Sequence, residues 1–236
     1  MKLDKTALTL YAVTDRHWAE QVSLEQVSLG QTSLENVSLE KNVQDVLFQH
    51  VKESLLGGVT MVQLREKDLD YANFKEEALS IQKLCAEFHV PFLINDNVEL
   101  AKEIDADGVH IGQSDMELIE ARKILGAHKI IGVSAQTVEQ AVQAEKNGAD
   151  YLGVGAVFPT SSKSDAVEVN HETLKAICSA VKIPVVAIGG ITQENISLLK
   201  NSGICGVAVI SAIFAQKDIT AASKSLFAKA KEFFNE

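Results

Sequence analysis

Long apolar runs, paired cysteines and a surplus of positive charge are all absent from this 236-residue sequence. Its longest uncharged apolar runs, such as residues 183–190, fall far short of the ~20 residues that a membrane-spanning helix needs. Its first residues, Met-Lys-Leu-Asp-Lys-Thr, carry charges where a signal peptide needs an apolar core. The three cysteines are too scattered for a disulfide framework and form no Cys-x-x-Cys pair, so no zinc site is indicated. We therefore expect a reduced, cytoplasmic protein.

Positive charge is scarce, because 22 Lys and Arg residues face 32 Asp and Glu residues, for a net charge of −10. Nucleic acids and anionic membrane surfaces attract proteins with a positive surplus, so neither is an expected partner. Hydrophobic residues make up 46% of the chain and charged residues 23%, as in globular domains, so a core can be buried. The acidic balance still allows a local cationic pocket for a phosphorylated small molecule.

A five-residue unit repeats four times in residues 21–40, which read QVSLE, QVSLG, QTSLE and NVSLE. Five matches neither the period of ~3.6 of a helix nor the period of ~2 of a strand. A pentapeptide solenoid is the alternative, but stacked architectures need more copies than these. We interpret residues 20–41 as a repeat-expanded surface insertion in the loop after the first strand, with no chemistry of its own.

Outside this insertion, short apolar runs alternate with segments of helical character. The runs cover residues 9–13, 60–64, 91–94, 108–111, 129–133, 151–155, 184–188 and 206–210. Continuous apolar runs are typical of parallel strands that are covered on both faces. Eight strand–helix units predict an α/β fold, a (β/α)8 TIM barrel that forms a single domain over residues 1–236. A doubly wound open sheet is the alternative, but the glycine-rich turn that such folds carry after the first strand is missing.

Barrel active sites lie at the carboxyl ends of the strands. There the sequence places Arg65 and Lys67 after the second run and Lys163 after the sixth. Three cations at one mouth suit a diphosphate, which arginine grips with two hydrogen bonds and lysine as a point charge. The alternative is a solvated loop in which Glu66 and Asp68 neutralise these cations.

Two carboxylates, Asp96 and Asp115, follow neighbouring strands, so we expect them to lie about one strand spacing apart, ~4.8 Å. Two hard oxygen ligands beside a phosphate site suit Mg²⁺, which completes its shell with water and phosphate. The alternative is that each aspartate caps the helix that follows it, because aspartate is a good N-cap. The pairing beside cations favours the metal interpretation.

After the seventh and eighth runs come Gly189-Gly190 and Ser211, where barrels commonly hold a phosphate on backbone N–H groups. The fourth run contains His110, which we interpret as a packed or hydrogen-bonded core histidine rather than a base. The residues thus predict one mouth with two phosphate sites, one cationic and metal-assisted, the other lined by backbone. Such a mouth suits two phosphorylated substrates, one of which carries a diphosphate leaving group.

Seven motifs spread along the chain together resemble the thiamine phosphate synthase family. They are LYAVTDR at residues 10–16, QLREK at 63–67, IND at 94–96, VHIGQSD at 109–115, GVS at 132–134, PTSSK at 159–163 and AIGGI at 187–191. The likeness covers nearly the whole chain from residue 8 except the insertion. It implies a transferase of thiamine biosynthesis that joins 4-amino-2-methyl-5-hydroxymethylpyrimidine diphosphate to 4-methyl-5-(2-phosphoethyl)thiazole and releases pyrophosphate. The implied reaction is a Mg²⁺-assisted dissociative substitution.

The resemblance also implies a role for each matching residue. The pyrimidine diphosphate would be held by Gln63, Arg65, Lys67, Asn95, Ser134 and Lys163, of which Arg65, Lys67, Ser134 and Lys163 would be catalytic. The thiazole phosphate would be held by Thr160, Ser161, Ser162, Gly190, Ile210 and Ser211, and Mg²⁺ by Asp96 and Asp115. The family's Thr-x-Thr-Lys is Thr160-Ser161-Ser162-Lys163 here, and serine keeps the hydroxyl.

Three other functions remain alternatives. A thiazole tautomerase-like barrel would need neither the cationic set nor both aspartates. A non-catalytic protein that binds phosphate ligands would hold both ligands without releasing pyrophosphate, and a phosphosugar isomerase would need a paired acid and base at the mouth. The sequence leaves association into a homo-oligomer open.

Overall fold

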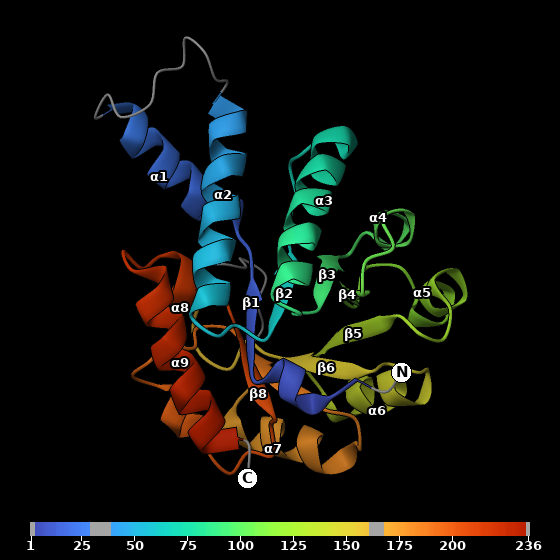
Figure 1. The fold of residues 1–236 in the computed structure, drawn as a ribbon. Helices are drawn as coiled ribbons and strands as arrows, with labels where there is room; N and C mark the ends of the chain where they lie inside the picture. The colour runs from blue at the N-terminus through green and yellow to red at the C-terminus, as the bar shows by residue number, and fades with distance from the viewer. Residues whose placement is uncertain (1–2, 29–38, 161–167, 235–236) are drawn as a thin grey trace.

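Eight parallel strands close into a barrel in chain order in the computed structural model, which describes residues 3–28, 39–160 and 168–234 (Figure 1). The strands are β1 (Leu10–Val13), β2 (Met61–Leu64), β3 (Phe92–Asn95), β4 (Gly108–Ile111), β5 (Ile130–Ala135), β6 (Tyr151–Val154), β7 (Val185–Ile188) and β8 (Gly206–Val209). Each of them overlaps one of the apolar runs, and β1 pairs with β8 to complete the ring. The predicted (β/α)8 barrel is confirmed.

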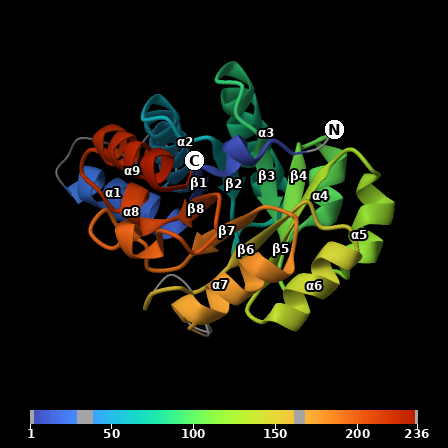
Figure 2. The same cartoon turned by 90° about the horizontal axis from the view of Figure 1, so that it is seen from below.

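Helices connect the strands and surround the barrel, as the view from below makes plain (Figure 2). They are α1 (Arg16–Ser28), α2 (Leu39–Leu56), α3 (Tyr71–Glu87), α4 (Val98–Glu103), α5 (Leu118–Leu125), α6 (Val138–Lys146), α7 (His171–Ala180), α8 (Ser211–Phe214) and α9 (Ile219–Phe234), with 3-10 turns η1 (Lys5–Leu8) and η2 (Ile196–Leu199). In α3 the residues that recur every three or four positions, among them Phe74, Ala78 and Ile81, are buried against the strands. None of the helices in these ranges has the length and apolarity that crossing a bilayer requires.

Two apolar cores result from the alternation of side chains along each strand. The larger one lies between the barrel and its helices. The smaller one fills the barrel interior and includes two fully buried tyrosines, Tyr11 and Tyr151. These phenols bring hydroxyl groups into an otherwise apolar space directly below the mouth.

The first copies of the pentapeptide repeat are helical, because α1 continues to Ser28. The expectation that a period of five would not form a helix is wrong there. Packing against α2 stabilises this helix despite the five-residue period of the sequence. Ala19 and Ser23 are buried, and the Asn42 side-chain amide donates a hydrogen bond to Ser23 Oγ at 2.6 Å. Residues 29–38, the rest of the repeat before α2, lie outside the described residues.

Candidate active site

A cavity of about 480 Å³ opens at the carboxyl ends of the strands. All the predicted site residues that the structure describes line it: Gln63, Arg65, Lys67, Asn95, Asp96, Asp115, Ser134, Thr160, Gly190, Ile210 and Ser211. Ser161, Ser162 and Lys163 lie outside the described residues. The topology explains the convergence, because parallel strands bring all eight carboxyl ends to one rim.

The end of β2 directs two cations into the cavity. Arg65 and Lys67 both line it, and the Arg65 backbone N–H donates a hydrogen bond to Thr14 Oγ1 at 2.9 Å. Glu66, between them, is buried on the other side of the chain. The alternative that Glu66 and Asp68 neutralise these cations is wrong, because in the described ranges neither cation reaches a carboxylate within ion-pair distance. The positive charge of both side chains therefore stays available to a ligand.

Glu66 belongs instead to a buried cluster with Arg16 and Glu77. Arg16 Nη1 lies 3.8 Å from Glu66 Oε2 and 3.0 Å from Glu77 Oε2. Burial, followed by the charge of Glu77, raises the pKa of Glu66 to about 9, and burial also raises the pKa of Glu77. At neutral pH the two carboxyl groups therefore share a proton. This cluster fixes the outer side of the strand end that carries Arg65 and Lys67.

The two predicted metal ligands form a second acidic pair, inside the cavity. Burial, followed by the hydrogen bond and negative charge of Asp115, raises the pKa of Asp96 to about 6, while Lys67 opposes the shift. Neither aspartate caps a helix: Asn97 caps α4, and Asp115 Oδ2 accepts a hydrogen bond from the Gly112 N–H at 2.6 Å. The capping alternative is therefore wrong. No cluster of three or more His, Cys, Asp or Glu side chains suited to a metal occurs among the described residues.

The far side of the cavity presents backbone rather than charge. Gly190 adopts a φ of +64°, and a Cβ there would lie 2.4 Å from the Pro159 carbonyl oxygen. Glycine thus allows the chain after β7 to pack closely against the loop that ends in Thr160. The N–H groups of Gly190 and Ser211 donate no hydrogen bond within the described part of the chain, so both are available to an anion.

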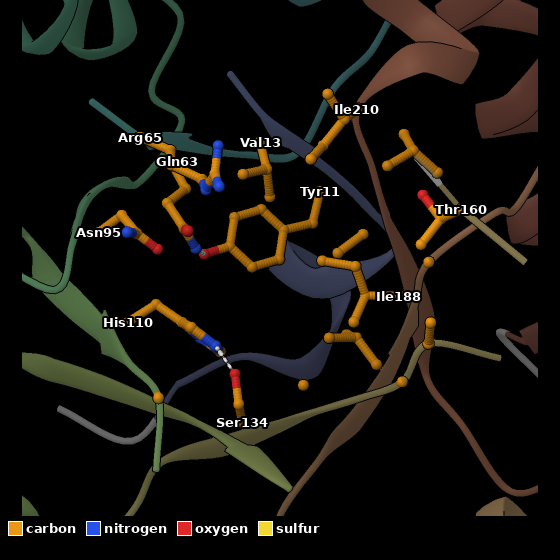
Figure 3. A pocket seen from close by; sticks show the side chains of 18 of the residues that line it. Tyr11, Val13, Gln63, Arg65, Asn95, His110, Ser134, Thr160, Ile188 and Ile210 are labelled. Atoms are coloured by element: carbon orange, nitrogen blue, oxygen red, sulfur yellow. Dashed lines mark hydrogen bonds between the residues drawn. The ribbon is translucent and has the colours of Figure 1, made fainter. Parts of the chain in front are cut away.

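The sequence reasoning assigned no ligand contact to several cavity residues, because they lie inside strands rather than after them. Tyr11, Val13, His110 and Ile188 all line the cavity (Figure 3). His110 is hydrogen-bonded, as predicted, but it also faces the ligand space. The regular alternation of inward-pointing strand residues is the signal that could have identified them.

Figure 3 separates the polar and apolar sides of the site. Gln63, Asn95, His110 and Ser134 gather on one side, and Ile188, Ile210 and Thr160 on the other. The first group offers hydrogen bonds to a polar ring, whereas the second offers apolar contact and a hydroxyl. Two different substrates can therefore lie face to face in one cavity.

Comparison with known proteins points to one family. A family model described as TMP-TENI, thiamine monophosphate synthase, matches residues 34–213. The chain is 50% identical over 181 residues to the thiamine-phosphate synthase of Clostridium acetobutylicum, a match that covers 77% of this chain and 86% of that protein. It is 49% identical over 183 residues to the thiamine-phosphate synthase of Methanobrevibacter smithii, covering 78% and 86%. Among solved structures, it is similar to thiamine phosphate pyrophosphorylase from Pyrococcus furiosus, with a TM-score of 0.80 and 35% identity over 97% of this chain and 98% of that chain.

Proposed function

This chain belongs to the thiamine monophosphate synthase family, whose members are transferases, and we propose how its barrel mouth carries out that activity. The mouth holds 4-amino-2-methyl-5-hydroxymethylpyrimidine diphosphate beside 4-methyl-5-(2-phosphoethyl)thiazole. Their condensation gives thiamine phosphate and pyrophosphate. The observation that carries the proposal is the pair of unneutralised cations, Arg65 and Lys67, in the cavity of a chain with a net charge of −10.

The pyrimidine diphosphate lies on the side of β2 to β5. Its diphosphate contacts Arg65 and Lys67, with Lys163 as a third cation assigned from the sequence motif. Its ring contacts Gln63, Asn95 and Ser134. Charge-assisted hydrogen bonds from preplaced cations are stronger than neutral ones, so this side binds the more highly charged substrate.

The thiazole phosphate lies on the opposite side. Its phosphate accepts hydrogen bonds from the N–H groups of Gly190 and Ser211 and from the Thr160 hydroxyl. Ile210 packs against its ring, and Ser161 and Ser162 are assigned to the same substrate from the sequence motif. The free N–H groups and the close approach required of Gly190 support this arrangement.

The acidic pair fits a divalent cation. Asp96 and Asp115 lie close enough to hydrogen-bond, and burial, followed by the hydrogen bond and negative charge of Asp115, raises the pKa of Asp96. A divalent cation bound to both carboxylates would offset this repulsion. We propose that both hold Mg²⁺, whose preferred ligands are oxygens. When bound, Mg²⁺ would neutralise charge on the diphosphate leaving group.

The bond changes need no strong base at the site. The C–O bond of the pyrimidine methylene group breaks and its electron pair leaves with the diphosphate, and the thiazole nitrogen then donates its lone pair to form the C–N bond. Arg65 and Lys67 stabilise the charge that develops on the leaving group. Gly190, Ser211 and Thr160 hold the nucleophile in place, while Val13 and Ile188 contribute apolar walls.

One assay tests this proposal directly. The two substrates are mixed with the protein in the presence and absence of Mg²⁺, and pyrophosphate and thiamine phosphate are both measured. We expect equal amounts of the two products, formed only with the metal. Binding without pyrophosphate release would instead indicate a ligand-binding protein that has kept the fold.

A further inference from the structure

A chain of hydrogen bonds runs below the cavity and connects two of its polar residues. It starts at Gln63, whose side-chain nitrogen donates to the Tyr11 hydroxyl. The Tyr11 and Tyr151 hydroxyls lie 2.9 Å apart, and Tyr151 lies 2.9 Å from His110 Nδ1. His110 Nε2 lies 3.0 Å from Ser134 Oγ, the contact drawn in Figure 3. Tyr11, Tyr151 and His110, here called the relay, thus connect two cavity residues on different strands.

The barrel makes room for the relay at two glycines. A Cβ on Gly132 would lie 2.1 Å from the Tyr151 ring, and a Cβ on Gly153 would lie 3.0 Å from His110 Cε1. The phenols are 1% exposed at Tyr11 and 0% exposed at Tyr151. Burying these hydroxyls in an apolar barrel is costly unless each finds a partner. The relay provides those partners.

The direction of the hydrogen bonds in the relay follows from the Gln63 amide, because either hydroxyl of the Tyr11–Tyr151 pair can donate and the His110 ring can carry its hydrogen on either nitrogen. Burial raises the pKa of both phenols, so each keeps its single hydrogen. Tyr11 accepts from Gln63 and therefore gives its own hydrogen to Tyr151. Tyr151 in turn gives its hydrogen to Nδ1 of His110, which places the imidazole hydrogen on Nε2. His110 then donates to Ser134 Oγ.

This direction determines what the cavity offers a ligand. The Gln63 nitrogen is used by Tyr11, so its carbonyl oxygen is left as an acceptor. The Ser134 oxygen is used by His110, so its O–H is left as a donor. The acceptor on Gln63 matches an amino group on a ring, and the donor on Ser134 matches a ring nitrogen that carries no hydrogen. The matching oxo ring presents the opposite pattern, a carbonyl and a ring N–H.

We propose that the relay fixes the hydrogen-bonding direction of Gln63 and Ser134 and so selects the 4-aminopyrimidine diphosphate over its 4-oxo counterpart. This inference rests on the proposed function, which places the pyrimidine against these two residues. Tyr11, Tyr151 and His110 are positioning residues here, because they act through Gln63 and Ser134. Sites built to hydrogen-bond a polar group reject analogues that leave their buried groups unpaired.

Removing one hydroxyl from the relay tests the proposal. Tyr11→Phe and Tyr151→Phe each keep the ring and remove both hydrogen bonds of one hydroxyl, so Gln63 can then turn its amide either way. We expect kcat/KM for the amino substrate to fall at least about tenfold, and the amino-to-oxo preference to fall by a similar factor. The KM for the thiazole phosphate should stay within about twofold. Tyr71→Phe removes an exposed hydroxyl that binds Glu103 and should change none of these values.

An unchanged amino-to-oxo preference in the folded variants overturns the proposal, with folding checked by thermal unfolding. If Tyr151→Phe does not fold, Tyr11→Phe carries the test alone, because its ring borders the cavity. A double variant adds a second readout. In a Ser134→Ala background, Tyr151→Phe acts on the site only through Gln63, so it should lower kcat/KM by less than it does in the unmodified protein, whereas a full additive loss contradicts the relay.

Ser134→Ala alone separates the two proposals. A large loss in Ser134→Ala, with no change in the tyrosine variants, overturns the relay and leaves the proposed function standing. No loss in Ser134→Ala means that the pyrimidine does not contact this residue, and both the assigned pyrimidine site and the relay then fail.

Discussion

The carboxyl groups of Glu66 and Glu77 lie close enough to share a proton, on the side of the β2 end that faces away from the cavity. Arg16 contacts both of them from the start of α1. Because Glu66 is held in this cluster, the residues on either side of it, Arg65 and Lys67, keep their charges for the cavity. A buried acidic pair therefore helps to leave the cations of the site free.

The Glu66–Glu77 pair predicts a stability that falls with rising pH. The pKa of Glu66 is raised from 4.5 to about 9, so the folded protein keeps a proton that the unfolded chain releases above about pH 4.5. The free energy of unfolding should then decrease between these two pH values, by roughly 1–3 kcal/mol. Glu66→Gln keeps a hydrogen-bond donor without titrating, so its pH dependence should be flatter. Urea unfolding at several pH values measures this.

Glu76→Gln is the matched control, because Glu76 is exposed on α3, the helix that also carries Glu77. Its curve should follow that of the unmodified protein. If the free energy of unfolding falls equally with pH in Glu66→Gln and in the unmodified protein, the acidic pair does not hold a proton.

Metal dependence is the second prediction. Asp96→Asn removes one carboxylate, and asparagine tolerates the φ of +61° found there. The Mg²⁺ concentration for half-maximal rate should rise at least about tenfold. Asp105→Asn is the control, because Asp105 also has a left-handed backbone, φ +55°, but its side chain is 86% exposed. Equal Mg²⁺ requirements in both variants would remove Asp96 from the metal site.

The two-substrate arrangement predicts a selective effect at Gly190. Gly190→Ala adds a Cβ that would lie 2.4 Å from the Pro159 carbonyl oxygen, so the backbone must shift. The KM for the thiazole phosphate should rise about tenfold, with a smaller change for the pyrimidine diphosphate. Gly126→Ala has comparable backbone strain, φ +80°, but open space around its Cβ. It should lower stability without altering either KM. Equal rises in both KM values for Gly190→Ala would argue against separate subsites.

The barrel could be predicted from sequence because its strands are continuous apolar runs separated by helical segments. The same pattern located the carboxyl ends of the strands, where barrel active sites lie, so Arg65 and Asp96 could be identified as candidate site residues from their positions after strands. The helical start of the repeat could not be predicted, because it depends on packing between α1 and α2 rather than on its period. Local capping rules left a helix cap as the alternative at Asp115, and only the structure shows that its carboxylate binds the Gly112 N–H instead of a helix end.

The interior of the barrel was the least predictable part. Nothing in the sequence near Tyr11 indicates a hydrogen bond to Tyr151, because the two residues are 140 positions apart in the sequence. The sequence likewise gives no sign that Gly132 is needed to make room for the Tyr151 ring, which packs against it. Such contacts depend on strand register around a closed barrel, which only the three-dimensional structure supplies.

Turnover of two cation variants tests the central claim most directly, that the barrel mouth stabilises a diphosphate leaving group. Arg65→Ala and Lys163→Ala should each lower the rate of thiamine phosphate formation at least about tenfold, with the fold intact by circular dichroism. Lys83→Ala, which removes an exposed cation on α3, should keep the full rate. Near-normal turnover in both Arg65→Ala and Lys163→Ala would contradict the roles assigned to these residues.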